Sequence, residues 1–162
     1  MVGGSLQGLV LCTKDRSECS TESGLQIPTM EFLDPKKIRR RYRGQYLGGR
    51  NLDSAIMSAP SEHYYAGTTK LDILASRMIW SISRAHALID GNKRASIELT
   101  DEFLAMNQHQ LKGSEDALYE VAMAAATRAF YFIPPLMQPL IADGAPEQAF
   151  AARYPAVLER LA

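Results

Sequence analysis

Apolar residues recur along this chain of 162 residues at intervals of three and four, the spacing that places them on one face of an α-helix. The segment LDILASRMIWSISRA (71–85) is apolar on most faces, which predicts a central, buried helix. A second helix is predicted over 92–107, with Asn107 as its stop. Its apolar stripe consists of Ala95, Leu99, Phe103 and Met106. No convincing alternation of strands and helices is present, so the pattern predicts an all-α fold.

Local start and stop signals predict further helices towards the amino end. In DPKKIRRRYRG (34–44), Pro35 has a first-turn position and Gly44 is a stop. The segment LDSAIMSA (52–59) predicts a short helix that ends before a proline. We expect SEHYYAGTTK (61–70) to be an aromatic loop with strand-like character and a glycine turn.

The carboxyl-terminal third follows the same pattern. Ser114 can cap a helix over 115–130, whose alanines allow close packing of neighbouring helices. Three prolines then interrupt the chain: Pro134, Pro135 and Pro139. A short helical tail is expected over 147–161.

Composition assigns one domain and an amino-terminal extension. Residues 1–28 are rich in Gly, Ser, Thr and Glu and predict a flexible tail, so the folded domain is expected over 29–162. The spacing of Cys12 and Cys19 matches no zinc or disulfide framework, which favours a reducing compartment. We find no convincing leader and no bilayer-spanning run. We therefore expect a cytoplasmic protein that does not contact membranes.

The charges are balanced overall but uneven locally. The formal net charge is zero, so the chain as a whole does not resemble a binder of polyanions, and any attraction for phosphate must be local. Six basic residues lie between Lys36 and Arg43. They are either a solvated helix face or a patch for nucleic acid or an acidic partner. We do not expect nucleic acid to be a partner of the protein.

Two cations stand where the helix over 92–107 begins. Lys93 and Arg94 follow the turn-and-cap sequence DGN, although the amino end of a helix already carries partial positive charge. One interpretation is that both cations point to water and that His86 is a hydrogen-bonded core residue. The other is an anion site, in which the open N–H groups of this turn and the two cations hold a phosphate.

Neighbouring residues complete a set suited to phosphate chemistry. Asp90 is a candidate Mg²⁺ ligand, because Mg²⁺ bridges carboxylates and phosphates. His86 is a candidate general base, because an imidazole can accept a proton near neutral pH. These parts are those of phosphoryl or nucleotidyl transfer. Neither a Walker A loop nor a kinase His-Arg-Asp loop is present.

The segment HALIDGNKR (86–94) resembles the signature of the Fic/Doc family, and its NKR ending resembles the Doc (death-on-curing toxin) branch. Fic enzymes that transfer AMP typically read H-x-F-x-[D/E]-G-N-G-R-x-x-R. Here Lys93 replaces the second glycine and Ile97 replaces the second arginine, as in Doc. GGRNLDSAIMSAP (48–60) is similar to an upstream family segment, and the resemblance covers roughly residues 44–130.

The resemblance implies roles for individual residues. His86 matches the catalytic base and Asp90 the Mg²⁺ ligand. The nucleotide- and phosphate-binding positions are Gly91, Asn92, Lys93, Arg94 and, matching an arginine of Doc, Arg84. Leu88 replaces a phenylalanine that packs under the loop, and residues 61–68 fall where the family has its target-docking flap.

The resemblance also implies a fold and a reaction. The fold is a compact Fic/Doc-type helical bundle with a short flap. The reaction is that of a Doc-like toxin of a toxin–antitoxin system, a kinase that uses ATP and Mg²⁺. It phosphorylates a Ser/Thr hydroxyl of a translation factor such as elongation factor Tu, which inhibits translation, and an antitoxin protein neutralises it in trans. Two alternatives remain open: a Fic-type AMP transferase, and a catalytically inactive Fic-fold binding protein.

Overall fold

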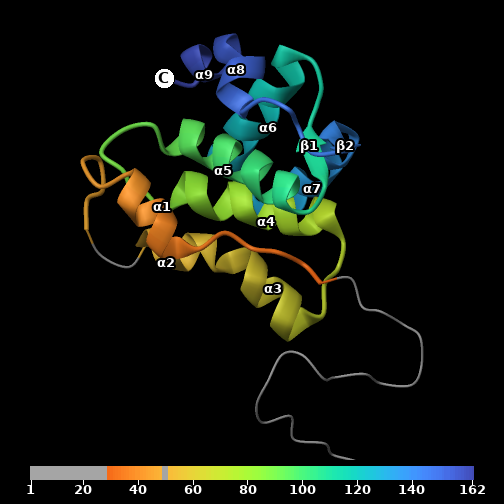
Figure 1. The fold of residues 1–162 in the computed structure, drawn as a ribbon. Helices are drawn as coiled ribbons and strands as arrows, with labels where there is room; N and C mark the ends of the chain where they lie inside the picture. Colours follow the sequence, from red (N-terminus) through yellow and green to blue (C-terminus); the bar gives the residue numbers. More distant parts are fainter. Residues whose placement is uncertain (1–28, 49–50) are drawn as a thin grey trace, which may run out of the picture.

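The computed structural model describes residues 29–48 and 51–162, and helices dominate it (Figure 1). The predicted tail (1–28) and both cysteines lie outside the described residues. The helices are α1 Pro35–Arg41, α2 Asn51–Ile56, α3 Ser58–Ala66, α4 Leu71–Arg84, α5 Asn92–Met106, α6 Glu115–Thr127, α7 Ile133–Met137, α8 Phe150–Arg153 and α9 Pro155–Arg160. Two strands are also present, so the all-α prediction is confirmed only for the dominant elements.

Helix α4 is the centre of the core, as its apolar pattern predicts. It contacts α2, α3, α5, α6 and α7, and in Figure 1 it runs beneath α5 through the middle of the molecule. Its buried residues are Leu74, Ala75, Ser76, Met78, Ile79, Ile82 and Ser83. The buried serines each donate a hydrogen bond to a carbonyl of the same helix, Ser76 to Asp72 and Ser83 to Trp80. A helix buried on most faces therefore carries no unsatisfied hydroxyl.

The Ser114 cap and the Asn107 stop are confirmed, whereas α1 ends at Arg41, three residues before its predicted stop at Gly44, and has Asp34 as its N-cap. The Asp34 carboxylate accepts a hydrogen bond from the Lys36 N–H at 2.9 Å, and Ser114 caps α6 through the Ala117 N–H at 3.2 Å. Helix α5 ends at Asn107, whose amide also donates to the Phe103 carbonyl. Side-chain oxygens satisfy helix N–H groups that have no intrahelical acceptor, which is why these signals are visible in sequence.

The segment around Pro60 differs from the prediction. Pro60 does not follow a helix; it is the third residue of α3, where a missing N–H removes no helical hydrogen bond. Since Pro60 cannot donate to the Ile56 carbonyl, the chain breaks into α2 and α3 around Met57 instead. The predicted aromatic loop (61–70), which includes the expected flap position (61–68), is therefore wrong up to Ala66. Gly67 (φ +70°) ends the helix in the left-handed conformation.

A short antiparallel pair of strands was not predicted. Strand β1 (His109–Leu111) pairs with β2 (Ile141–Asp143), with Gln110 opposite Ala142. Three residues are too few to establish a periodicity of two. The prolines before β2 do not simply interrupt the chain, because Pro134 and Pro135 lie in the first turn of α7.

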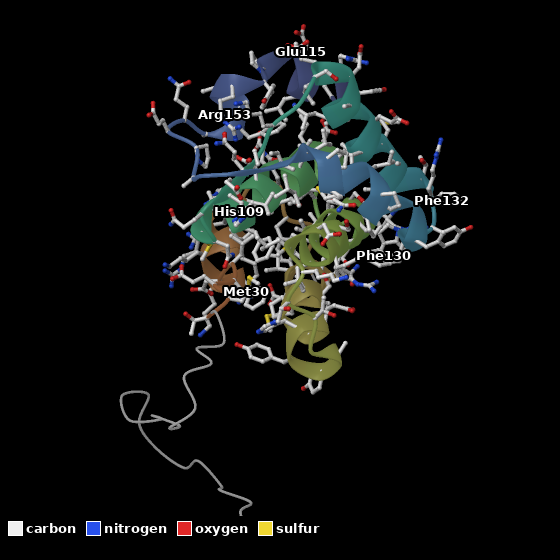
Figure 2. All side chains as sticks on the ribbon, turned by 90° about the vertical axis from the view of Figure 1, so that its right-hand side faces the viewer. Met30, His109, Glu115, Phe130, Phe132 and Arg153 are labelled. Atoms are coloured by element: carbon white, nitrogen blue, oxygen red, sulfur yellow. The ribbon has the colours of Figure 1, made fainter. Side chains whose placement is uncertain are left out.

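The carboxyl-terminal helices are attached to α5 by a buried ion pair. Arg153 donates to the Asp101 carboxylate at 2.5 Å, and the two side chains are 16% and 4% exposed. Arg153 also donates to the Leu111 carbonyl at 2.8 Å, while Asp101 accepts from the Leu111 N–H at 2.8 Å. In Figure 2, Arg153 lies on the same side of the molecule as His109, opposite Phe130 and Phe132. The salt bridge thus joins α5 to α8, and the hydrogen bonds of both side chains to Leu111 attach β1 to the same pair.

Among the helices of the described part of the chain, none is long and apolar enough to cross a bilayer.

Candidate active site

The HALIDGNKR segment forms the loop between α4 and α5 and the first turn of α5. Two backbone hydrogen bonds attach this loop to the segment that follows α1. The Leu47 N–H donates to the Ala87 carbonyl at 2.9 Å, and the Ile89 N–H donates to the Gln45 carbonyl at 2.8 Å. The loop is therefore fixed to a part of the chain that lies about forty residues earlier in the sequence.

Asn92 holds the loop from the inside. Its Oδ1 accepts from the Leu88 N–H at 3.1 Å, and its Nδ2 donates to the Leu88 carbonyl at 3.0 Å. The Leu88 side chain is buried, which agrees with its predicted role as an apolar anchor. The Asn92 side chain is thus occupied with the loop, and only its backbone N–H is left to face an anion.

These two hydrogen bonds between the Asn92 side chain and the Leu88 backbone lead to a stability prediction. Asn92→Ala should lower the free energy of unfolding by about 2 kcal/mol, because both polar groups of the Leu88 backbone lose their partner. Asn92→Asp is the matched control: it keeps the acceptor for the Leu88 N–H and loses only the donor. Urea denaturation gives the energies, and hydrogen exchange should show faster exchange at residues 86–91. Unchanged hydrogen exchange at these residues in Asn92→Ala would show that the Asn92 side chain does not hold the loop.

His86 has an unusual backbone conformation. Its φ is +48°, in the left-handed region, which few residues other than glycine adopt. The side chain is exposed, and its imidazole makes no hydrogen bond to any described residue. It is therefore not the hydrogen-bonded core histidine of the alternative interpretation. Strained backbone that the surroundings maintain is concentrated at functional sites.

Asp90 and Arg94 form an ion pair across the turn. The distance from Arg94 Nη2 to Asp90 Oδ2 is 3.2 Å, and Asp90 Oδ1 accepts from the Gly91 N–H at 2.6 Å. Gly91 has φ +79°, and a Cβ there would lie 3.3 Å from Arg94 Nη2. Glycine thus permits both the turn and the close approach of the guanidinium.

The two cations at the start of α5 have different surroundings. Arg94 also lies near Glu98: burial raises the pKa of the Glu98 carboxyl, which the charges of Arg94 and Arg41 partly oppose. Arg94 is therefore paired with Asp90 and lies near the Glu98 carboxyl. Lys93 has no ion pair with a described residue and borders the cleft described next, so it is the cation that remains unexplained by the protein itself.

Most of the predicted residues surround one open cleft of about 330 Å³. His86, Asp90, Gly91, Asn92 and Lys93 line it. The other lining residues are Ser83, Ile89, Ala126, Leu161 and Ala162. Ile89 belongs to the HALIDGNKR loop, whereas no sequence signal indicated the other four residues, because they come from α4, α6 and positions 161–162 and meet only through packing. The N-cap of α5, Gly91, makes no side-chain hydrogen bond to the helix, so the first N–H groups of α5 have no side-chain cap.

Arg84 has a different environment from the one predicted for a nucleotide ligand. Its Nη1 donates to the carbonyls of Ala126 at 3.2 Å and Arg128 at 3.4 Å, and its guanidinium lies 5.2 Å from the Trp80 ring centroid. It neutralises the carboxyl end of α6. It is not among the residues that line the cleft.

The donor set is compatible with a phosphate-bound Mg²⁺. Within the described ranges, no group of three His, Cys, Asp or Glu side chains could hold a metal ion. Mg²⁺ needs less than this, because it keeps several waters and takes one or two carboxylates plus phosphate oxygens. The Asp90 carboxylate is 80% exposed and retains free lone pairs beyond its bonds to Gly91 and Arg94.

Comparison of the chain with models of protein families gives no match, and comparison with curated proteins gives none either.

Proposed function

We propose that this protein is a Doc-like phosphotransferase that moves the γ-phosphoryl group of ATP to a hydroxyl group of another protein. One observation supports this most strongly: His86, Asp90 and Lys93 line one cleft at the uncapped amino end of α5. A base, a carboxylate and a cation beside open N–H groups are the components that phosphoryl transfer needs. The resemblance of residues 86–94 to the Fic/Doc signature supports the same reaction.

Each residue has a chemical role in the proposed reaction. The Lys93 ammonium and the N–H groups of Asn92 and Lys93 bind phosphate oxygens. Asp90 holds Mg²⁺, which neutralises charge on the phosphates. His86 accepts the proton of the target hydroxyl as its oxygen forms a bond to the γ-phosphorus. The bond from the γ-phosphorus to the β–γ bridging oxygen breaks, and ADP leaves with that electron pair.

The position of Lys93 favours phosphate transfer over AMP transfer. Its side chain occupies the edge of the cleft where Fic-type AMP transferases have a glycine. A glycine would leave room for an additional phosphate at this point, whereas a lysine fills it. We therefore propose that the γ-phosphate, and not the α-phosphate, lies closest to His86.

The proposed partners follow from the Doc resemblance. The substrate is a translation factor such as elongation factor Tu, modified on a serine or threonine in the cytoplasm. A separate antitoxin neutralises the protein in trans. Production of the protein alone in cells should therefore stop translation and growth.

Mass spectrometry tests the reaction. The protein is incubated with a translation extract, ATP and Mg²⁺, and modified proteins are identified by intact mass and peptide mapping. We expect one protein to gain the mass of one phosphate on a serine or threonine. A gain of one AMP would instead establish the AMP transferase. Absence of any modification, while the protein still arrests growth, would establish a binding protein without turnover.

A further inference from the structure

A second cleft, separate from the candidate active site, lies beside α1. Its volume is about 340 Å³, and four of its five lining residues are cations. The lining residues are Lys36, Arg39, Arg40, Arg43 and Tyr46. None of them is a carboxylate, so the cleft has strong positive potential in a protein with no net charge.

Helix energetics account for only part of this cluster, namely Arg39 and Arg40 in the last turn of α1. Cations stabilise the last turn of a helix, but Lys36 lies in the first turn of α1, which contains no acidic residue. Lys36 and Arg40 are four positions apart, a spacing at which like charges repel. This pair of charges therefore opposes helix formation.

Neighbouring carboxylates neutralise only part of the basic run. Arg41 points away from the cleft and makes a two-bond ion pair with Glu102, at 2.6 and 3.0 Å. Arg39 lies 3.2 Å from Asp53. Lys36, Arg40 and Arg43 have no ion pair with any described residue. Three positive charges of the cleft thus remain without compensation.

The hydroxyl of Tyr46 is the second feature of the cleft. Its oxygen is buried and finds no hydrogen-bond partner in the described part of the chain. A buried hydroxyl without a partner is costly and uncommon in proteins. The backbone at Tyr46 pairs with Leu88 of the loop between α4 and α5. The cleft therefore combines a buried hydroxyl that has no partner with four exposed cations.

We propose that this cleft binds a ligand with two or more phosphate groups. The planar guanidinium groups of Arg40 and Arg43 match phosphate oxygens, and the Tyr46 hydroxyl supplies one directed hydrogen bond. One phosphate group carries a charge of about −1.5 to −2, so a single one would not balance the cluster. The phosphates are those of a free polyphosphate or nucleotide, or those of a nucleic-acid strand, and the experiment distinguishes these sources.

Equilibrium binding to the full chain tests the proposal, with tripolyphosphate, a short single-stranded RNA and polyglutamate as probes. The test variant is Lys36→Ala/Arg40→Ala. Its matched control, Lys37→Ala/Lys112→Ala, removes the same charge from exposed residues that do not line the cleft. We expect the test variant to bind the phosphate probe at least about tenfold more weakly and the control to stay close to wild type. A Lys93→Ala variant should retain this binding, which separates the cleft from the candidate active site.

Tyr46→Phe removes only the hydroxyl. We expect it to weaken phosphate binding by about tenfold, without lowering the unfolding midpoint, since it deletes a buried group that has no partner. Binding of tripolyphosphate alone would assign a free polyphosphate, and tighter binding of RNA would assign a nucleic acid. Equal losses in the test and control variants, no binding of either phosphate probe, or tighter binding of polyglutamate that ignores Tyr46→Phe would overturn the proposal.

Discussion

Replacing His86 by alanine should lower phosphoryl transfer by about 10²- to 10⁴-fold, the usual effect of removing a general base. The imidazole is exposed and makes no hydrogen bond to any described residue, so the variant should still fold and should bind ATP as the wild type does. Initial rates with the identified substrate measure the first effect, and titration calorimetry with ATP and thermal unfolding measure the other two.

The backbone at His86 calls for a second variant. A backbone φ of +48° is energetically less favourable for alanine than for histidine. Asparagine adopts this left-handed conformation readily, and its side chain cannot act as a base. His86→Asn should therefore be as inactive as His86→Ala while its stability stays closer to wild type. If cells producing either variant still stop growing, the toxicity does not depend on this base, and the binding-protein alternative becomes the better account.

Replacing Asp101 by alanine should lower the free energy of unfolding by about 3 kcal/mol or more. The substitution leaves the largely buried charge of Arg153 without its partner and removes the acceptor of the Leu111 N–H. Arg153 retains its bond to the Leu111 carbonyl, which limits the loss. Denaturant titration monitored by circular dichroism provides the measurement.

Glu102→Ala is the matched control for this prediction. Glu102 is the next residue along α5 and also pairs with an arginine, Arg41, but these two side chains are 38% and 49% exposed. The hydrogen bond to Glu102 raises the pKa of Arg41, although solvent screens an exposed pair, so we expect a loss of no more than about 1 kcal/mol. Equal losses from Asp101→Ala and Glu102→Ala would show that burial does not decide the effect.

A double substitution measures how much stability is lost because the Arg153 charge has no partner in Asp101→Ala. Arg153→Met should cost less stability in the Asp101→Ala background than in the wild type, because no buried charge then lacks a partner. Additive losses would mean that Asp101 acts mainly through its bond to Leu111.

The sequence alone determined the elements that depend on local interactions. The predictions of the apolar runs of α4 and α5, the Ser114 cap and the Asn107 stop are all correct, because each involves residues a few positions apart. The candidate site was identifiable for the same reason. His86, Asp90 and Lys93 lie within eight consecutive residues, so one loop and one helix start bring them together.

Only the tertiary structure decided what each polar side chain binds. Arg84 meets carbonyls of α6, and Asp101 meets Arg153 fifty-two positions later. Contacts at such separations leave no periodicity or spacing in the sequence, since they depend on how helices pack and not on local backbone preferences. The bridge from Tyr46 to Leu88 and the cation-lined cleft beside α1 have the same origin. Local patterns therefore located the candidate site, and long-range packing determined which charges of the described residues have an oppositely charged partner.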